Sequence, residues 1–168
     1  MKQRVQSILF FLSAIVFGLL FFMPLASYVD DYGTYLKLYI YGVNKVSVAP
    51  NVEVPFSSIY TLPLLILTVA VILINFYISM SIFRAVKLQQ FVKLFKLSRI
   101  NIALAAVLIA TIFVYYIVKT GSFVAALPSF VWPNWGAFLT LIALIMMMVA
   151  SSGLKKDIDK VKSVDRLR

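Results

Sequence analysis

Cysteine and histidine are both absent from this chain of 168 residues. Without cysteine, the chain can form no disulfide, and it offers neither a thiol redox site nor a thiolate ligand for a metal. Without histidine, it lacks the commonest general base and the usual ligand of haem and zinc. We therefore expect no catalytic residue, no metal site and no cofactor, and we expect that the protein is not an enzyme.

Acidic residues are also scarce. The chain has 6 Asp and Glu against 16 Lys and Arg, so its formal net charge is +10. Such a surplus can indicate binding to nucleic acid. Here, however, the basic residues flank long apolar segments, which is where membrane proteins place them. We therefore expect membrane lipids, and not nucleic acid, among the partners.

Hydrophobic residues, in contrast, make up 62% of the chain, and the mean hydropathy is +0.98. A helix of about 20 residues, rising ~1.5 Å per residue, crosses the ~30 Å hydrocarbon core of a bilayer. Four uncharged segments have about this length. The sequence predicts an all-α membrane protein, a bundle of four transmembrane helices that forms a single integral membrane domain. The expected spans are residues 8–27, 58–83, 100–118 and 135–152.

The basic residues predict how these spans are oriented. Two lie in residues 1–6, five in the loop 84–99 and six in the tail 153–168, so one side of the membrane would hold 13 of the 16. Cytoplasmic segments carry the excess of Lys and Arg in membrane proteins. We therefore expect both termini and the loop 84–99 in the cytoplasm, and the loops 28–57 and 119–134 outside.

The outer loop 28–57 contains an alternating pattern. From Tyr35 to Tyr41, Tyr and Lys alternate with Leu and Ile, which is the two-residue period of a strand. Residues 42–45 supply turn chemistry, and residues 46–48 can return as a second strand. The pattern predicts a small external β-hairpin between spans 1 and 2. Because a lone hairpin is marginal in water, we expect it to lean on the bilayer surface or on the other outer loop. It is either a recognition surface or a Tyr-rich interfacial cap, and we favour the cap.

The inner loop 84–99 has two interpretations. It is either an amphipathic element for an anionic leaflet or a partner, or the ends of two span helices that project past the lipid and meet at a tight turn. We slightly favour the second. We also expect Gly153 to end the fourth span. The tail that follows is either a solvated anchor or a docking helix for a cytoplasmic partner.

Polar residues inside the spans are few. Asn75 and Ser79 share one helix face, and we expect them to make interhelical polar contacts rather than to form a ligand site. Small side chains at Ala103, Ala106 and Ala110 predict a face suited to close helix packing. Asp, Glu, Lys, Arg and His are absent from all four expected spans. Since coupled carriers and pumps need such a residue at membrane depth, these classes are disfavoured.

Three polar segments carry a resemblance to a known family. Residues 3–6 (Gln-Arg-Val-Gln), 87–89 (Lys-Leu-Gln) and 159–168 (ending Ser-Val-Asp-Arg-Leu-Arg) resemble those of short four-span bacterial inner-membrane proteins, the family known as domain of unknown function 4293. The resemblance implies a bacterial cytoplasmic membrane, and it implies no activity or cofactor. Because its signature lies in the cytoplasmic ends, it favours partner docking there. The residues expected to dock a partner are Ser163, Asp165, Arg166, Arg168, Lys87 and Gln89.

Three functional hypotheses follow. The first is a non-enzymatic accessory or scaffold subunit that docks a protein partner through its basic cytoplasmic loop and C-terminal tail, with arginine offering planar, bidentate contacts. The second is a channel or facilitator for a neutral or lipidic solute, lined by Asn75, Ser79 and Thr111. The third is a membrane protein that binds anionic lipids through its basic inner face. Self-association is left open.

Overall fold

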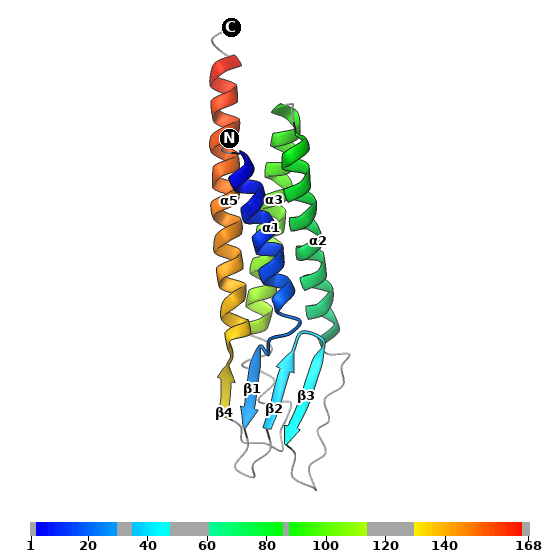
Figure 1. Cartoon of the computed structure of the whole chain (residues 1–168). Helices are drawn as coiled ribbons and strands as arrows, with labels where there is room; N and C mark the ends of the chain where they lie inside the picture. The colour runs from blue at the N-terminus through cyan, green and yellow to red at the C-terminus, as the bar shows by residue number, and fades with distance from the viewer. Residues whose placement is uncertain (1–2, 30–34, 48–60, 86–87, 114–129, 166–168) are drawn as a thin grey trace.

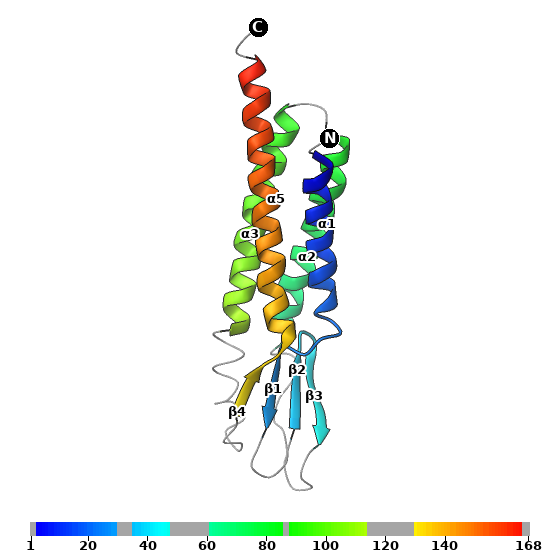
Figure 2. The ribbon, with the colours of Figure 1, turned by 60° about the vertical axis from the view of Figure 1, so that its left-hand side comes forward.

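Four helices and a small sheet make up the described part of the protein. The computed structural model describes residues 3–29, 35–47, 61–85, 88–113 and 130–165. The helices run side by side, with the sheet at one end and both chain termini at the opposite end (Figures 1 and 2). The helices are α1 (Gln3–Leu19), α2 (Leu62–Arg84), α3 (Leu88–Ala110) and α5 (Trp135–Asp165). The strands are β1 (Ala26–Val29), β2 (Tyr35–Tyr39), β3 (Gly42–Ser47) and β4 (Phe130–Pro133).

Three of the helices are long and apolar enough to cross a membrane. They cover residues Leu62–Arg84, Leu88–Phe113 and Trp135–Ser163. Many of the apolar side chains on the outside of the bundle are exposed, for example Leu73 at 63% and Ile145 at 60%. A surface of this kind is too apolar for a typical soluble monomer. The structure is therefore mostly helical and compatible with a membrane protein.

The first helix is shorter than the sequence indicated. We expected a span over residues 8–27, but α1 has 17 residues and ends at Leu19. Pro24 explains the difference, because proline has no backbone N–H and disfavours helical geometry in the residue before it. The chain turns after Leu19, and Leu25 N–H then donates to Leu38 O at 2.7 Å. The last part of the expected span is therefore strand β1.

The sheet contains the predicted hairpin and two further strands. Its order is β3-β2-β1-β4, with antiparallel pairing throughout. The predicted alternation of β2 is present, since Leu36, Leu38 and Ile40 are buried. The turn was placed too late in the sequence: Tyr39 pairs with Gly42, so the connecting residues are Ile40 and Tyr41 rather than residues 42–45.

The segment before α5 completes this sheet. Strand β4 pairs with β1, where Ser27 lies opposite Trp132. The hairpin is therefore extended by the segment that was expected to be the other outer loop, which was one of its two expected supports. Both added strands were missed because each has only 4 residues. Strand β1 also continues an apolar run, and β4 ends on a proline, which is tolerated at the edge of a sheet.

The C-terminal helix is longer than the sequence indicated. We expected Gly153 to end the fourth span, but α5 continues through it as one helix of 31 residues. A Cβ at Gly153 would lie 3.0 Å from Gln6 Nε2 of α1. This glycine therefore serves close helix packing rather than helix termination. At the same end of the bundle, α2 reaches Arg84 and α3 begins at Leu88, as in the interpretation of the inner loop as two helix ends.

Candidate functional site at the polar end of the bundle

Side chains from α1 and α2 form a reciprocal serine pair near the chain termini. Ser7 Oγ donates to Ser79 O at 2.7 Å, Ser79 Oγ donates to Ser7 O at 2.9 Å, and the two hydroxyl oxygens lie 3.0 Å apart. Both residues are buried. Small hydroxyl side chains allow two backbones to approach this closely, so the pair fixes the contact between α1 and α2.

An asparagine pair links three helices one turn before Ser79 in α2, on the side toward the sheet (Figure 1). Asn101 Nδ2 of α3 donates to Asn75 Oδ1 at 2.8 Å, and Asn75 Nδ2 lies 3.6 Å from the sulfur of Met147 on α5. Both asparagines are fully buried. Asn75 and Ser79, the two residues expected to make interhelical polar contacts, therefore each bond to another helix.

Two further contacts bring α5 into the same polar region. Ser98 of α3 and Ser151 of α5 have hydroxyl oxygens 2.9 Å apart. Closer to the termini, Gln6 Nε2 of α1 donates to Asp157 Oδ2 at 2.8 Å. Every neighbouring pair of helices at this end is thus joined by at least one side-chain polar contact. Such contacts contribute about 0.6–2 kcal/mol each between apolar helices.

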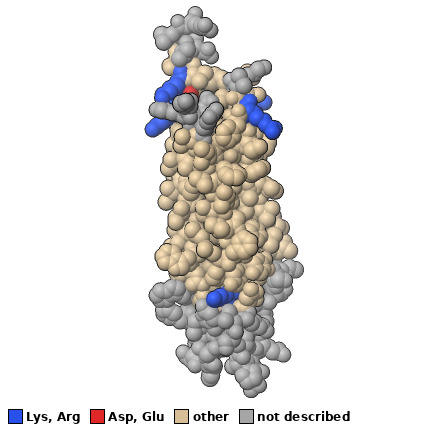
Figure 3. Space-filling model, in the orientation of Figure 1, with Lys and Arg blue, Asp and Glu red and all other residues tan. Residues whose placement is uncertain are grey.

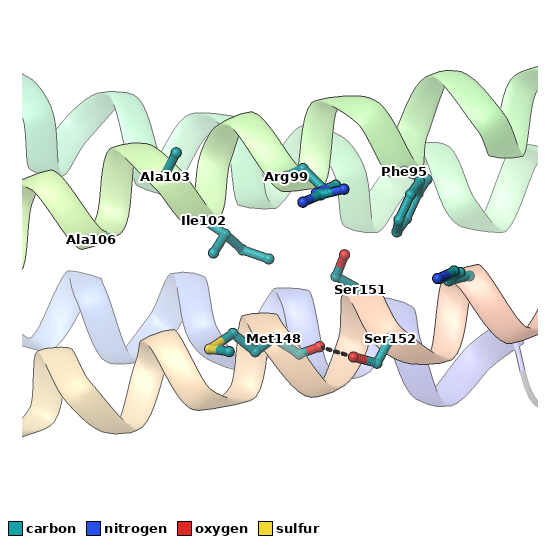
Figure 4. A pocket seen from close by; sticks show the side chains of 9 residues that line it. Phe95, Arg99, Ile102, Ala103, Ala106, Met148, Ser151 and Ser152 are labelled. Atoms are coloured by element: carbon teal, nitrogen blue, oxygen red, sulfur yellow. Dashed lines mark hydrogen bonds between the residues drawn. The ribbon is translucent and has the colours of Figure 1, made fainter.

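A groove of about 520 Å³ opens between α3 and α5 beside the Ser98–Ser151 contact. We call it the α3–α5 groove. Figure 4 shows Arg99 and Phe95 on α3 facing Ser151 and Ser152 on α5. Its lining residues are Phe95, Arg99, Ile102, Ala103, Ala106, Met148, Ser151, Ser152 and Lys155. The groove is therefore cationic at the end near the termini and apolar toward the middle of the helices.

The small-residue face of α3 does not pack as we expected. Ala103, Ala106 and Ala110 are exposed, and the first two line the α3–α5 groove. The face turned into the bundle carries Ser98, Asn101 and Ala105 instead. Because the two polar side chains find partners on other helices, the helical period directs the three alanines outward. The prediction of close packing on the alanine face was wrong.

A second, smaller groove lies between α2 and α3. Its volume is about 240 Å³, and we call it the α2–α3 groove. It also holds two cations, Arg84 and Lys93, but its wall is more polar because Tyr77, Ser81 and Gln90 contribute to it. The two grooves therefore lie at the same end of the molecule and flank α3, while differing in size and in apolar lining.

Three of the six residues expected to dock a partner are described, one on α3 and two on α5. Gln89 is exposed on the first turn of α3, and Ser163 is exposed near the end of α5, where its hydroxyl donates to Lys160 O at 2.7 Å. Asp165 is the last residue of α5. The remaining three, Lys87, Arg166 and Arg168, lie outside the described residues.

Sequence comparison adds one result to this geometry. The family described as Domain of unknown function (DUF4293) matches residues 2–167. The chain belongs to this family. The chain matches no curated protein sequence.

Sequence reasoning missed several polar residues of this DUF4293 protein. Arg99 and Ser98 were assigned to a loop, so their place beside α5 was not foreseen. Asn101 has the same residue type as Asn75 and could have been found as its partner, since both lie near the same end of their spans. In the part of the chain that the structure describes, no three His, Cys, Asp or Glu residues come together as metal ligands.

Proposed function

We propose that this DUF4293 protein is a four-span, non-enzymatic scaffold or accessory subunit of the bacterial cytoplasmic membrane. In this proposal its cytoplasmic end docks a protein partner through the last turns of α5. The observation that carries the proposal is the continuation of α5 beyond the other helices (Figure 1).

Membrane placement is supported by the distribution of charge. In Figure 3, Lys and Arg gather at the end near the termini, and a broad band without charged side chains lies below them. Arg84, Lys93, Arg99 and Lys155 all belong to the grooves at that end. An excess of Lys and Arg is typical of the cytoplasmic side, which supports our proposal that both termini lie there and the sheet outside.

Helix α1 serves as the fourth span in this proposal. Its 17 residues extend for about 25 Å, which is somewhat less than a typical hydrocarbon core of about 30 Å. A short span is tolerated through local thinning of the bilayer. Its outward side chains are apolar, including Val5, Ile8 and Ile15, while Phe10 and Phe17 are buried among the other helices.

The end of α5 leaves the core of the bundle after Ile158. Ile158 is still buried, whereas Val161 is 40% exposed and Lys160, Lys162 and Ser163 are exposed. An isolated helical end gains little stability from its own hydrogen bonds, because most helical stability comes from packing. An exposed helical end with an apolar residue among charges is suited to docking against a partner helix or groove.

Photo-crosslinking in intact membranes tests this proposal. A photoreactive residue at position 161 is expected to give a discrete protein adduct, and Arg166→Ala with Arg168→Ala should abolish it. The matched control is position 107, since Val107 is also an exposed valine but lies on the apolar side of α3. Identical adducts at positions 161 and 107 would contradict docking.

The facilitator hypothesis receives less support from the geometry. It requires Asn75, Ser79 and Thr111 to line one path. Asn75 and Ser79 are buried and bonded to other helices, while Thr111 Oγ1 donates to Val107 O of its own helix at 2.8 Å. Each of the three polar side chains already bonds within the protein, which favours a scaffold over a facilitator.

A further inference from the structure

The α3–α5 groove holds two cations from different helices. Arg99 and Lys155 both line it, and among the described residues neither makes a hydrogen bond or an ion pair. Two acids lie near Lys155 on α5. Asp157 accepts a hydrogen bond from Gln6 of α1, and Asp159 makes no ion pair with Lys155 among the described residues. Two like charges at one groove repel each other, and an anion between them removes that repulsion. Guanidinium and ammonium groups together are suited to a phosphate.

The serine hydroxyls at this groove are already committed as donors. Ser98 Oγ donates to Phe95 O at 2.8 Å, so in the Ser98–Ser151 contact the proton belongs to Ser151. Ser152 Oγ donates to Met148 O at 2.9 Å (Figure 4). Because each hydroxyl has only one proton, neither Ser151 nor Ser152 has one left for a phosphate oxygen. Recognition of an anion therefore falls to the two cations.

The rest of the groove is apolar and uncovered. Beyond Arg99 its lining consists of Ile102, Ala103, Ala106 and Met148. Alanine leaves space above the helix, and the side chain of Met148 is 51% exposed and can adapt to an irregular ligand. The volume of about 520 Å³ lies in the range of small-molecule sites. A groove that is charged at one end and apolar along the rest of its length matches a lipid with a phosphate headgroup and an acyl chain.

We propose that the α3–α5 groove binds one anionic phospholipid, with Arg99 and Lys155 on its phosphate and an acyl chain along Ala103 and Ala106. This proposal rests on the membrane placement proposed above, because the cations then lie at headgroup level and the alanines at acyl-chain level. It does not depend on partner docking. The net charge indicates only a general affinity for anionic lipids, whereas this proposal gives the lipid a defined site.

Lipid titration of the detergent-purified full chain, followed by native mass spectrometry, tests the site. The probe is phosphatidylglycerol. Arg99→Gln with Lys155→Gln is expected to weaken the first binding event about 25-fold, because each cation near an anionic headgroup contributes roughly a factor of five. The matched control is Arg84→Gln with Lys93→Gln, which removes the same charge from the α2–α3 groove and should change affinity less than about twofold. An equal loss in both variants would mean unspecific attraction and would overturn the proposal.

Two more variants test the parts of the site. Ala103→Leu keeps every charge but fills the apolar part of the α3–α5 groove, so it should also weaken phosphatidylglycerol binding. Ser13→Ala, which lies near the sheet and outside the groove, should leave binding unchanged. If Ala103→Leu has no effect, or if free glycerol phosphate displaces the lipid at equal concentration, the groove is an anion site and not a lipid site. Equal affinity for phosphatidylcholine would likewise contradict it.

Membrane fractionation separates this proposal from the one on which it rests. If the protein partitions into the membrane fraction but shows no selective lipid binding, only the groove assignment fails. If the protein is recovered in the soluble fraction, the membrane placement fails and the lipid site fails with it. Circular dichroism of each variant confirms that its helices are intact.

Discussion

The two halves of the helix bundle contain similar buried polar side chains, but these side chains bond to different partners. Near the termini, Ser7, Asn101 and Ser151 bond to side chains or carbonyls of other helices. Near the sheet, Ser13, Thr68 and Thr140 are equally buried, but each hydroxyl donates to a carbonyl of its own helix.

This difference follows from what else holds each half together. At the sheet end, strands β1 and β4 link the end of α1 to the start of α5, and apolar side chains such as Phe17 and Leu20 fill the core. At the other end no strand connects the helices in the described residues. Side-chain hydrogen bonds between helices take over that role, and they leave the two cationic grooves between α3 and its neighbours open.

The largest effect should come from filling the tight contact at the sheet end. A Cβ at Gly136 would lie 2.5 Å from Pro24 O, which is backbone and cannot rotate away. We therefore expect Gly136→Ala to lower the free energy of unfolding in detergent by about 1–3 kcal/mol. Gly153→Ala is the control at the other end. Its Cβ would meet the flexible end of Gln6, so the loss should be less than about 1 kcal/mol. Equal losses of stability in Gly136→Ala and Gly153→Ala would contradict the difference between the two ends of the bundle.

Breaking the asparagine pair should have the next largest effect. Asn101→Ala removes the hydrogen bond to Asn75 and leaves Asn75 Oδ1 buried without a partner. We expect a loss of about 1–2 kcal/mol in the free energy of unfolding. In the half near the sheet, Thr140→Val removes a hydroxyl that bonds only within its helix, so its effect should be smaller than about 1 kcal/mol. A Thr140→Val variant as unstable as Asn101→Ala would show that the two halves are alike.

A double-mutant cycle on the serine pair should give a smaller but specific effect. Ser7→Ala and Ser79→Ala each remove one side of the same contact, so their combined effect should fall short of the sum by about 0.6 kcal/mol. Thermal unfolding of the four proteins in detergent measures this coupling. Ser13→Ala combined with Ser79→Ala is the control pair and should be additive. Additivity in both cycles would contradict an interhelical role for Ser7.

The smallest effect is expected at the projecting end of α5. Ser163 is exposed and bonds only to Lys160 O of its own helix. Ser163→Ala should therefore change the free energy of unfolding by less than about 0.5 kcal/mol. A larger loss would show that this end is part of the folded bundle and not free for docking.

The sequence predicted the helices well and their boundaries less well. Long apolar runs identify α2, α3 and α5, because few other structures satisfy the backbone in an apolar environment. The alternation from Tyr35 to Tyr41 identified β2. The end of α1 could have been predicted from Pro24, but the length of the apolar run suggested a longer helix. The continuation of α5 through Gly153 could not be predicted, since it depends on the approach of α1.

The candidate site was harder to predict than the fold. Asn75 and Ser79 could be recognised as polar residues on one helix face, but their partners depend on how the helices rotate. That rotation also decided whether Ala103 and Ala106 would be packed or exposed. The residue pattern of one helix predicts which side chains share a face, but it does not predict which helix that face contacts. For this reason the two cations of the α3–α5 groove, 56 positions apart in the chain, became a pair only in the folded structure.

The pairing of β1 with β4 has a consequence for how the protein is made. Asn134 Nδ2 donates to Ser27 Oγ across 107 positions of sequence, next to the paired strands. During synthesis, β1 can pair with β2 early, but its other edge stays open until β4 has been translated about 100 residues later. Closure of the four-stranded sheet is thus a late step in folding, because it joins the segment after α1 to the segment before α5.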